Sequence, residues 1–423
     1  MNRKTMTVIT SLTFLGACSI AEPLLSETSV ADNKSAEQVQ SFVLTYIDVS
    51  QIELNKQKML QTNSIYHDAL KYTLARADKA LKRAPNPVTN KPNAGPSGNL
   101  HDYLSIGPYW WPDPTKVDGL PWIRKDGEVN PLTRGNNTDQ TRASTFLNDL
   151  GALNLAYLYA TKATTKSAYL KKSQQLIKLW LIDSNTKMNP HLNFAQGVPG
   201  KSTGRPFGII EWEKISNIIT SIELLTHSNS VHQTFIQQAN SWLTEYLNWL
   251  LTSKIGMQEA ATKNNHANWY DYQVLGLMIH LGQTEQAIHY SQTLKHKRIN
   301  SQINADGAQP YELARTKSIN YSSMNLMAFL KVAELADKLG VDLLNHQGPE
   351  GQSIKLAVEY LLPYVQGKKE WQYKQLGGIQ KAFEQKAYST LYVANKVLKD
   401  TTVPNVLLKN NIQHVKPELI LSY

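Results

Sequence analysis

The sequence predicts an all-α protein, because apolar side chains recur every three or four residues through most of the chain. Phe146, Leu150, Leu153 and Tyr157 have this spacing, which places them on one face of a helix. No segment shows the sustained alternation of apolar and polar residues that marks a half-buried strand. These patterns predict roughly ten or more helices joined by loops of unequal length.

The expected helices follow one another along the whole body of the chain. In order they cover Tyr66–Lys82, Phe146–Tyr157, Tyr169–Trp180, Ile215–Leu225, Phe235–Tyr246, Trp269–Leu281, Met324–Leu339, Ile354–Leu362 and Ala382–Leu398. Gly340 follows one of these segments directly, and glycine is the usual residue at the position where a helix stops.

Two arrangements suit so many helices, an open superhelical solenoid and a closed toroid of helical hairpins. A solenoid of the tetratricopeptide kind has a fixed short repeat, and this sequence shows none. The unequal loops, several of them rich in unusual residues, favour an (α/α) toroid, an incomplete barrel of helical hairpins. No linker is evident after Gln40, so we expect residues 41–423 to form a single domain.

The first residues are organised like a secretory signal. A short positive segment, Asn2–Lys4, precedes an apolar run from Thr7 to Phe14 that is too short to cross a bilayer. Leu15-Gly16-Ala17-Cys18 follows and resembles the lipobox of bacterial lipoproteins, in which the cysteine is lipidated and becomes the mature N-terminus. We interpret residues 1–17 as a lipoprotein signal peptide and residues 18–40, which are polar, as a flexible tether.

Cys18 is the only cysteine, so the mature chain has no intramolecular disulfide, zinc–thiolate site or thiol nucleophile. Ser19 resembles the residue found at this position in lipoproteins sent to the outer membrane. We therefore expect a monomer anchored to a membrane through lipid on Cys18, in the periplasm or outer membrane of a Gram-negative bacterium.

The net charge of +10 favours anionic partners. The lysines are scattered and do not form a stripe, so we expect no nucleic acid partner. Outside the cytoplasm, acidic polysaccharides are the expected polyanions. No carboxylate-rich metal cluster is evident in the sequence, and we expect neither a metal nor a cofactor.

Residues 101–130 form an irregular segment with an unusual concentration of aromatic residues. Tyr109, Trp110 and Trp111 are candidates for stacking on sugar rings, because an aromatic face buries the C–H surface of a sugar and leaves its hydroxyls in water. Arg124 could bind a carboxylate. A single tryptophan in such a loop can equally serve to pin the loop to the core.

Residues 189–207 form a second polar, glycine-rich loop. Gln196 and Arg205 are its candidates for binding sugar hydroxyls and carboxylates.

A third segment, residues 259–271, places Asn264, Asn265 and His266 where a loop enters a helix expected to start near Trp269. A helix N-terminus offers free N–H groups and partial positive charge to a carboxylate or a developing anion. Trp269 and Tyr270 come shortly after His266, and we expect both to contact substrate together with Asn264.

A fourth segment contains Glu312, Arg315 and Tyr321. Arg315 and Tyr321 are near enough in sequence to share a pocket, and an arginine beside a phenol lowers its pKa and lets it transfer protons. Glu312 is a candidate substrate contact. A capping arginine and a half-buried tyrosine would give the same pattern.

Taken together, these segments resemble the alginate lyase family from about residue 60 to 400. The stretches that carry the resemblance are His101-Asp102-Tyr103, Pro108-Tyr-Trp-Trp-Pro-Asp-Pro114, Asp126-Gly-Glu-Val-Asn-Pro131, Lys263-Asn-Asn-His266 with Trp269-Tyr270-Asp271, and Glu312-Leu-Ala-Arg315 with Asn320-Tyr321. The resemblance implies an (α/α) toroid with a tunnel or cleft for an acidic polysaccharide such as alginate. It also implies a catalytic set of Asn265 (or Asn264), His266, Arg315 and Tyr321. The family includes enzymes with different uronate preferences, so it implies the reaction, β-elimination, more directly than the uronate.

The chemistry of β-elimination suits these side chains. The C5 proton beside a uronate carboxylate is weakly acidic, so the enzyme must neutralise that carboxylate, which Asn265 with Asn264 or His266 can do. Tyr321 can act as base and acid when the proton and leaving group lie on one face, as in mannuronate. His266 can act as base from the other face, as guluronate requires. Arg315 would hold Tyr321 partly ionised.

Two other functions remain open from the sequence. A glycoside hydrolase on the same toroid needs a pair of carboxylates across the scissile bond, for which Asp271 and Glu312 are candidates. A non-catalytic polysaccharide-binding lipoprotein would keep the aromatic loop but needs no His/Arg/Tyr set.

Overall fold

Helices make up most of the chain that the computed structural model describes, which is residues 42–60, 64–135 and 138–423. The signal peptide, Cys18 and the tether expected from the sequence lie outside these described residues. The part from Phe42 to Tyr423 forms one compact unit. Among the described residues, no helix has the length and apolar character needed to cross a bilayer.

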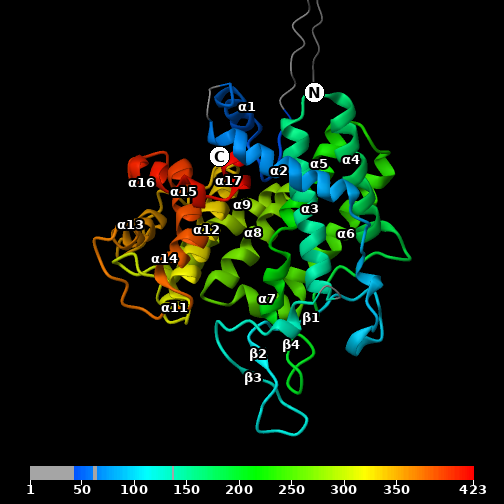
Figure 1. Ribbon diagram of the computed structural model, residues 1–423, viewed down its shortest axis with the longest axis horizontal. Coiled ribbons are helices and arrows are strands. Elements are labelled where there is room, and N and C mark those ends of the chain that lie inside the picture. Colours follow the sequence, from blue (N-terminus) through cyan, green and yellow to red (C-terminus); the bar gives the residue numbers. More distant parts are fainter. Residues whose placement is uncertain (1–41, 61–63, 136–137) are drawn as a thin grey trace, which may run out of the picture. The chain divides into compact units, whose positions relative to one another are not determined.

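The helices and strands of this unit are shown in Figure 1. The helices are α1 (Val49–Lys58), α2 (Ile65–Lys82), α3 (Asp139–Tyr159), α4 (Ala163–Ile177), α5 (Ile215–His227), α6 (Gln233–Thr252), α7 (Lys254–Ala260), α8 (Asn265–His280), α9 (Thr284–Leu294), α10 (Asn300–Gln302), α11 (Pro310–Leu313), α12 (Ser318–Asp337), α13 (Ile354–Val365), α14 (Ile379–Ala382), α15 (Tyr388–Leu398), α16 (Asn405–Asn410) and α17 (Pro417–Ser422). The strands are β1 (Leu104–Ile106), β2 (Trp110–Trp111), β3 (Ile123–Arg124) and β4 (Phe194–Gly197).

An inner row of helices carries most of the core. Helices α3, α5, α8, α12 and α15 pack side by side in this order. An outer helix flanks each step of the row: α4 lies beside α3 and α5, α6 beside α5 and α8, α9 beside α8, and α13 beside α12 and α15. This succession of helical hairpins confirms the predicted all-α toroid.

Buried side-chain amides join neighbouring inner helices near their starts. Asn268 in α8 donates to the side-chain oxygen of Asn325 in α12 at 2.6 Å. Both residues lie within the first turns of their helices, so the N-termini of α8 and α12 meet at one end of the unit. The short helices α7 and α11, which lead into them, lie at that same end with the four strands (Figure 1).

The four strands are a feature that the sequence did not predict. β1 pairs in parallel with β4, and β2 pairs antiparallel with β3. Strands of two to four residues are too short to show the alternation by which a strand is recognised. They lie within the irregular segments 101–130 and 189–207, and the β1–β4 pair fastens these two loops to each other.

Most expected helices are present, with shifts at their ends. Gly340 has φ +72° and follows α12, and the N–H of Val341 bonds to the carbonyl of Ala336, so the predicted glycine stop is confirmed. α8 starts at Asn265, earlier than the expected start near Trp269, because Asn264 caps it.

Candidate active site

The first turn of α8 carries the asparagine and the histidine that the sequence indicated. The side-chain oxygen of Asn264 accepts a hydrogen bond from the backbone N–H of His266 at 3.1 Å. An asparagine in this capping position satisfies one of the free N–H groups at a helix start. Asn265 and His266 therefore belong to the helix itself, at the positive end of its dipole.

Asn265 is completely buried and bound to Glu312. Its backbone N–H donates to Glu312 Oε1 at 2.5 Å, and its Nδ2 lies 3.0 Å from each carboxylate oxygen. Burial raises the pKa of Glu312, while the hydrogen bonds from Asn265 and the charges of His266 and Arg315 act in the opposite direction. Glu312 is itself buried, so it holds Asn265 in place, which differs from the substrate contact expected from the sequence.

His266 is held by a second buried carboxylate. Its Nδ1 lies 2.7 Å from Oε1 of Glu259, a completely buried residue of α7. The ring of Phe207 contacts the imidazole edge-on, with 4.9 Å between ring centroids. Because Nδ1 is engaged by Glu259, Nε2 is the ring nitrogen that a substrate can use.

Arg315 connects the aromatic loop to the start of α12. Its guanidinium lies over the ring of Tyr321, 3.9 Å from the centroid, and its Nη2 donates to Oδ1 of Asp126 at 2.8 Å. Thr316 Oγ1 also donates to Asp126 at 2.9 Å. Burial opposes ionisation of Asp126, but these hydrogen bonds and the Arg315 charge outweigh it and hold the pKa of this carboxyl well below its usual range.

The hydroxyl of Tyr321 lies 2.7 Å from the hydroxyl of Tyr109. Burial raises the pKa of Tyr321 well above that of an exposed tyrosine, and Tyr109 adds to the increase, while the charge of Arg315 lowers it only in part. The expectation that Arg315 keeps Tyr321 partly ionised is therefore wrong for this structure. Desolvation outweighs the arginine, and Tyr321 is a neutral phenol.

The two motifs face a common group. The charges of His266, from α8, and of Arg315, from the segment before α12, both act on the carboxylate of Glu312. Tyr321 is in contact with Arg315, and Tyr109 with Tyr321. The structure thus brings together side chains from the aromatic loop, α8 and α12 that lie far apart in the sequence.

The wall beside this group is cationic and aromatic. Lys201 and Arg205 lie over the ring of Trp110, at 4.7 and 5.3 Å from its centroid. Arg205 Nε donates to the carbonyl of Gln196 at 2.8 Å, and Gln196 has a left-handed backbone with φ +48°. Burial lowers the pKa of Arg205 to about 10, and the charge of Arg124 contributes to the decrease.

Trp111 and Arg124 lie at the surface, on the β2–β3 hairpin. The ammonium of Lys125 lies 5.0 Å from the Trp111 ring, and Arg124 pairs with Asp126 at 2.7 Å. The hairpin therefore presents a partly exposed indole and an exposed guanidinium beside the group of catalytic candidates.

Comparison with known proteins supplies the family. The alginate lyase family model matches residues 87–371. An alginate lyase from Bacteroides ovatus is 32% identical, with 90% of this chain and 100% of that chain covered and a TM-score of 0.81. The chain belongs to the alginate lyase family. It is a polysaccharide lyase.

More distant members of the alginate lyase family share the fold. One similar structure is that of a His-to-Ala variant of alginate lyase A1-III complexed with a tetrasaccharide. It is 16% identical, with a TM-score of 0.57 and with 89% of this chain and 94% of that chain covered. A Tyr-to-Phe variant, also complexed with a tetrasaccharide, gives 15% identity and a TM-score of 0.56, with 89% and 95% covered. At these identities the likeness concerns the fold alone. No curated protein matches the sequence.

Two residues of this chain that the sequence led us to expect as substrate contacts lie in the core. Trp269 and Tyr270 are buried, and the Tyr270 hydroxyl donates to the carbonyl of Leu250 at 2.8 Å. α8 is an inner helix surrounded by other helices, so the aromatic residues beyond its first turn pack inside the protein. Neither ring is exposed to a substrate in this structure.

The carboxylate pair of the hydrolase hypothesis is also not exposed. Asp271 is completely buried and paired with Arg298 at 2.6 Å, and it accepts a hydrogen bond from Tyr290. The carboxylate of Glu312 is engaged by hydrogen bonds from Asn265. Neither carboxylate is free to act on a glycosidic bond, in agreement with membership of a lyase family.

The sequence did not indicate the roles of two residues that the structure places in the candidate site. Glu259 and Asp126 were noted only as parts of longer segments, and no local pattern indicates that they bind His266 and Arg315. Their roles arise from contacts between separate segments. In the described part of the chain, no three histidine, cysteine, aspartate or glutamate side chains are grouped so that they could hold a metal ion.

Proposed function

We propose that this lyase cleaves alginate or a related polyuronate by β-elimination, with Asn265, His266, Arg315 and Tyr321 as catalytic residues. The observation that carries the proposal is the arrangement of Asn265 and His266. They stand on one helix N-terminus, each held by its own buried carboxylate, in a group that includes the Arg315–Tyr321 stack.

The first task of the site is to neutralise the uronate carboxylate. The Asn265 amide provides a hydrogen-bond donor, the N-terminus of α8 provides partial positive charge, and Arg315 provides a full positive charge. Both oxygens of Glu312 engage Nδ2 of Asn265, and this nitrogen carries two N–H groups, so the amide would serve the substrate by turning one N–H away from Glu312. Hydrogen bonds to the carboxylate allow the charge that develops at C5 to spread onto its oxygens.

The second task is to move two protons. A base removes the C5 proton, the C5–H electrons form the C4=C5 double bond, and the C4–O4 bond breaks as O4 takes a proton from an acid. Neutral Tyr321 suits the acid role directly. His266 Nε2 suits the base role for guluronate. For mannuronate Tyr321 would act as base from its ionised form. Its proton would first pass to the Tyr109 hydroxyl, 2.7 Å away, as this partly exposed hydroxyl releases its own proton to water, and Tyr321 would then carry the C5 proton to O4.

Ultraviolet absorbance tests the reaction, because only elimination leaves a double bond conjugated with the carboxylate. We expect absorbance to rise in step with new reducing ends on polymannuronate, polyguluronate or both. New reducing ends without absorbance would refute the lyase mechanism. If the enzyme acts on neither polymer but acts on glucuronan or a glycosaminoglycan, its substrate is a uronate polymer other than alginate.

We also propose that the protein is a monomeric lipoprotein anchored through Cys18 in the periplasm or outer membrane of a Gram-negative bacterium. The positive, apolar and small-residue order before Cys18 supports this. We expect the full chain to partition with membranes, and a Cys18→Ser variant to be released into the soluble fraction. Soluble wild-type protein would refute the anchor, and sedimentation of the variant as a dimer would refute the monomer.

A further inference from the structure

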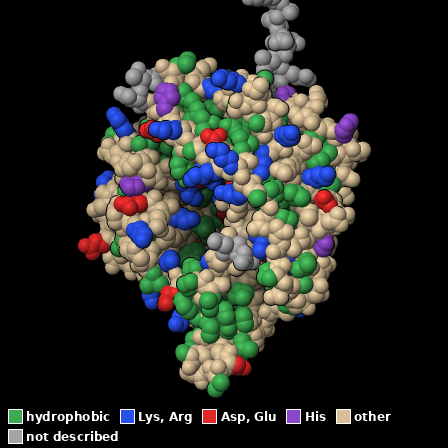
Figure 2. Space-filling view, turned by 45° about the vertical axis from the view of Figure 1, so that its right-hand side comes forward, with side chains coloured by type: hydrophobic (Ala, Val, Ile, Leu, Met, Phe, Trp, Pro, Cys, Tyr) green, Lys and Arg blue, Asp and Glu red, His purple; other side chains and the backbone are tan. Residues whose placement is uncertain are grey.

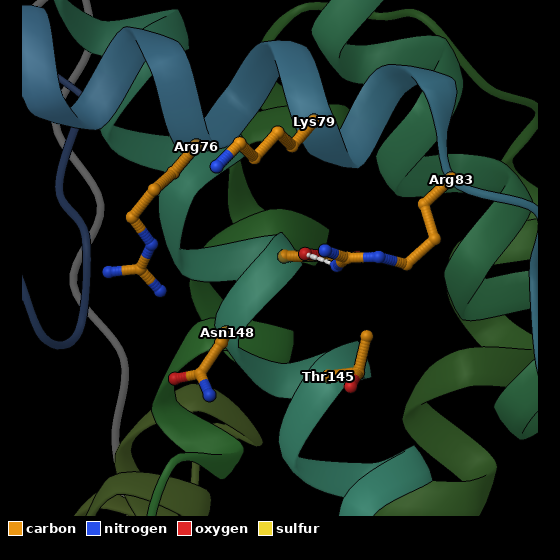
Figure 3. A pocket seen from close by; sticks show the side chains of 6 residues that line it. Arg76, Lys79, Arg83, Thr145 and Asn148 are labelled. Atoms are coloured by element: carbon orange, nitrogen blue, oxygen red, sulfur yellow. Dashed lines mark hydrogen bonds and ion pairs between the residues drawn. The ribbon is translucent and has the colours of Figure 1, made fainter. Parts of the chain in front are cut away.

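A cationic pocket lies between α2 and α3 (Figure 3). It has a volume of about 180 Å³ and is lined by Arg76, Lys79, Arg83, Thr145, Asn148 and Asp149. Arg76 and Lys79 belong to α2 and Arg83 directly follows its last residue, where it forms an ion pair with Asp149 of α3. Arg76 and Lys79 line the same space, and no carboxylate in the described part of the chain lies within ion-pair distance of either.

The positive charge continues from this pocket toward the start of α5. Nζ of Lys214 donates to Oδ1 of Asn148 at 2.7 Å, so Lys214 adjoins the pocket. Lys214 is close enough to Arg76 and Lys416 for their positive charges to repel its own. The charge of Lys386 is likewise repelled by those of Lys214 and Lys416. These residues come from separate elements and form one continuous cluster.

The cluster has more positive than negative charge. Its cations are Arg76, Lys79, Arg83, Lys214, Lys386 and Lys416, and the carboxylates that act on them are Asp149, Glu213 and Glu418. Of these cations, all within the described residues, only Arg83 has an ion pair with a carboxylate. Glu213 also faces the buried ammonium of Lys331, so its charge is shared. The cluster is therefore an uncompensated site for anions.

Burial makes the repulsion between these cations stronger. It lowers the pKa of Lys214 and of Lys386, and the charge of Lys416 lowers both further. Charges that are partly removed from water interact more strongly and are less screened by salt than charges on an open surface. An anion bound among these side chains would relieve their mutual repulsion.

The cluster begins near the catalytic candidates. The 3-10 helix Pro206–Trp212 carries Phe207, whose ring contacts His266, and Lys214 follows its other end. At about 2 Å per residue, a 3-10 helix of this length spans roughly 14 Å. Lysine and arginine side chains gather around a hollow on one face of the molecule (Figure 2). A polymer engaged at His266 could thus reach this cluster within a few sugars.

We propose that this cluster is a distal subsite, which binds the carboxylates of a polyuronate strand beyond the catalytic residues and makes the enzyme favour long chains over short oligosaccharides. The inference rests on the proposed action on polyuronates. A polyuronate carries one carboxylate on each sugar, so a strand crossing the cluster offers several anions to several cations at once. A trimer held at the catalytic residues does not extend to all of them.

The test uses a full-length Arg76→Gln/Lys416→Gln variant, because neither side chain belongs to the proposed catalytic set. The matched control is Lys162→Gln/Lys399→Gln, which removes the same charge from exposed positions just beyond the far ends of α3 and α15. Initial rates are measured by ultraviolet absorbance on long polymannuronate and polyguluronate and on their trimers, at low and physiological salt.

For the better long polymer, we expect KM to rise roughly three- to thirtyfold in the Arg76/Lys416 variant, the range for losing two ion contacts. Its kcat on the trimer should stay within about twofold, and its KM should depend less on salt than that of the wild type. The control should match the wild type throughout. Equal KM values for the two double variants on the long polymer would overturn the proposal.

The outcomes separate this inference from the proposed function. A wild type that produces no absorbance on any polyuronate would overturn both. An active wild type whose Arg76/Lys416 variant behaves like the control would overturn the subsite alone. Binding to vesicles of anionic phospholipid, measured in a Cys18→Ser background, tests a lipid headgroup as the anion. Loss of vesicle binding in the variant, with an unchanged KM on long polymer, would assign the cluster to a membrane and refute the subsite.

Discussion

Replacing Glu259 with glutamine tests whether a buried carboxylate sets the state of His266. In the structure Glu259 Oε1 accepts from His266 Nδ1 at 2.7 Å, and the other carboxylate oxygen is buried without a partner. Glutamine has nearly the same shape and keeps the oxygen that can accept this bond. The substitution therefore removes the negative charge and changes little else.

The expected loss of activity follows from the strength of that bond. A hydrogen bond to a charged group stabilises by roughly 1.5–3 kcal/mol, against about 1 kcal/mol for a neutral one. Losing roughly 1–2 kcal/mol of transition-state stabilisation lowers kcat/KM by about five- to thirtyfold. If the new amide turns its NH2 group toward Nδ1, it favours the wrong imidazole tautomer, and losses of up to about 10⁴-fold are known for such pairs. We expect at least about a fivefold loss on guluronate-rich polymer, for which His266 is the proposed base.

Stability should respond differently from activity. Glu259 is completely buried, so a neutral replacement removes a charge that is costly to desolvate. We expect the unfolding temperature of Glu259→Gln to fall by no more than about 2 °C. Thermal unfolding and initial rates measured on the same preparation separate a loss of positioning from a loss of folding.

The chain contains a matched control at the other end of the same helix. His280 Nδ1 lies 3.1 Å from Glu223 Oε1, and 14 residues of α8 separate the two histidines, roughly 21 Å along the helix. Glu223 also accepts hydrogen bonds from Thr45, so Glu223→Gln should lower stability while leaving kcat/KM unchanged. Wild-type kcat/KM in Glu259→Gln on every uronate would refute the reasoning, as would an equal loss in the control.

Two further substitutions test the other half of the site. Tyr321→Phe should lower kcat by about 10³-fold or more with KM within about threefold, because it removes the proton donor and retains the ring under Arg315; turnover near that of the wild type would remove Tyr321 from the mechanism. Asp126→Asn should lower the free energy of unfolding by about 1–2 kcal/mol at pH 7, because the pKa of Asp126 is depressed in the folded state. This contribution is present above the unfolded pKa of about 3.9 and is lost as pH falls toward the folded value, so the gap between the wild type and the variant should begin to narrow below about pH 4 in urea titrations. A gap that stays constant from pH 7 to pH 3 would contradict the assignment to this carboxylate.

The helices could be predicted from the sequence because periodicity is local. The stripe from Phe146 to Tyr157 depends only on residues within a few turns of one another, and it lies within α3. The start of α8 was misplaced by one turn because the large apolar side chains of this helix begin at Trp269, whereas its first turn is mostly polar and is marked only by the cap that Asn264 forms.

The identities of the candidate site residues could be predicted from the sequence, but their positions relative to one another could not. Asn265, His266, Arg315 and Tyr321 stand in recognisable motifs, and the structure brings their segments together. The direction of the Tyr321 pKa could not be predicted, since it depends on how much water the fold excludes. Burial outweighs the neighbouring arginine, and no pattern in the sequence reports that balance.

The long-range contacts explain why the site can handle an anion that gains charge during the reaction. The carboxylates of Glu259 and Glu312 are buried: Glu259 binds the ring nitrogen of His266 that does not face substrate, and Glu312 holds the Asn265 amide in place. The cations Arg205 and Arg124 remain at least partly open to solvent, on the loops over the site. Negative charge is thus used inside the protein to orient the two catalytic candidates, and positive charge is left on the side from which a polyanion arrives. If the buried carboxylates instead faced the cleft, they would repel the substrate carboxylate and oppose the enolate that forms from it.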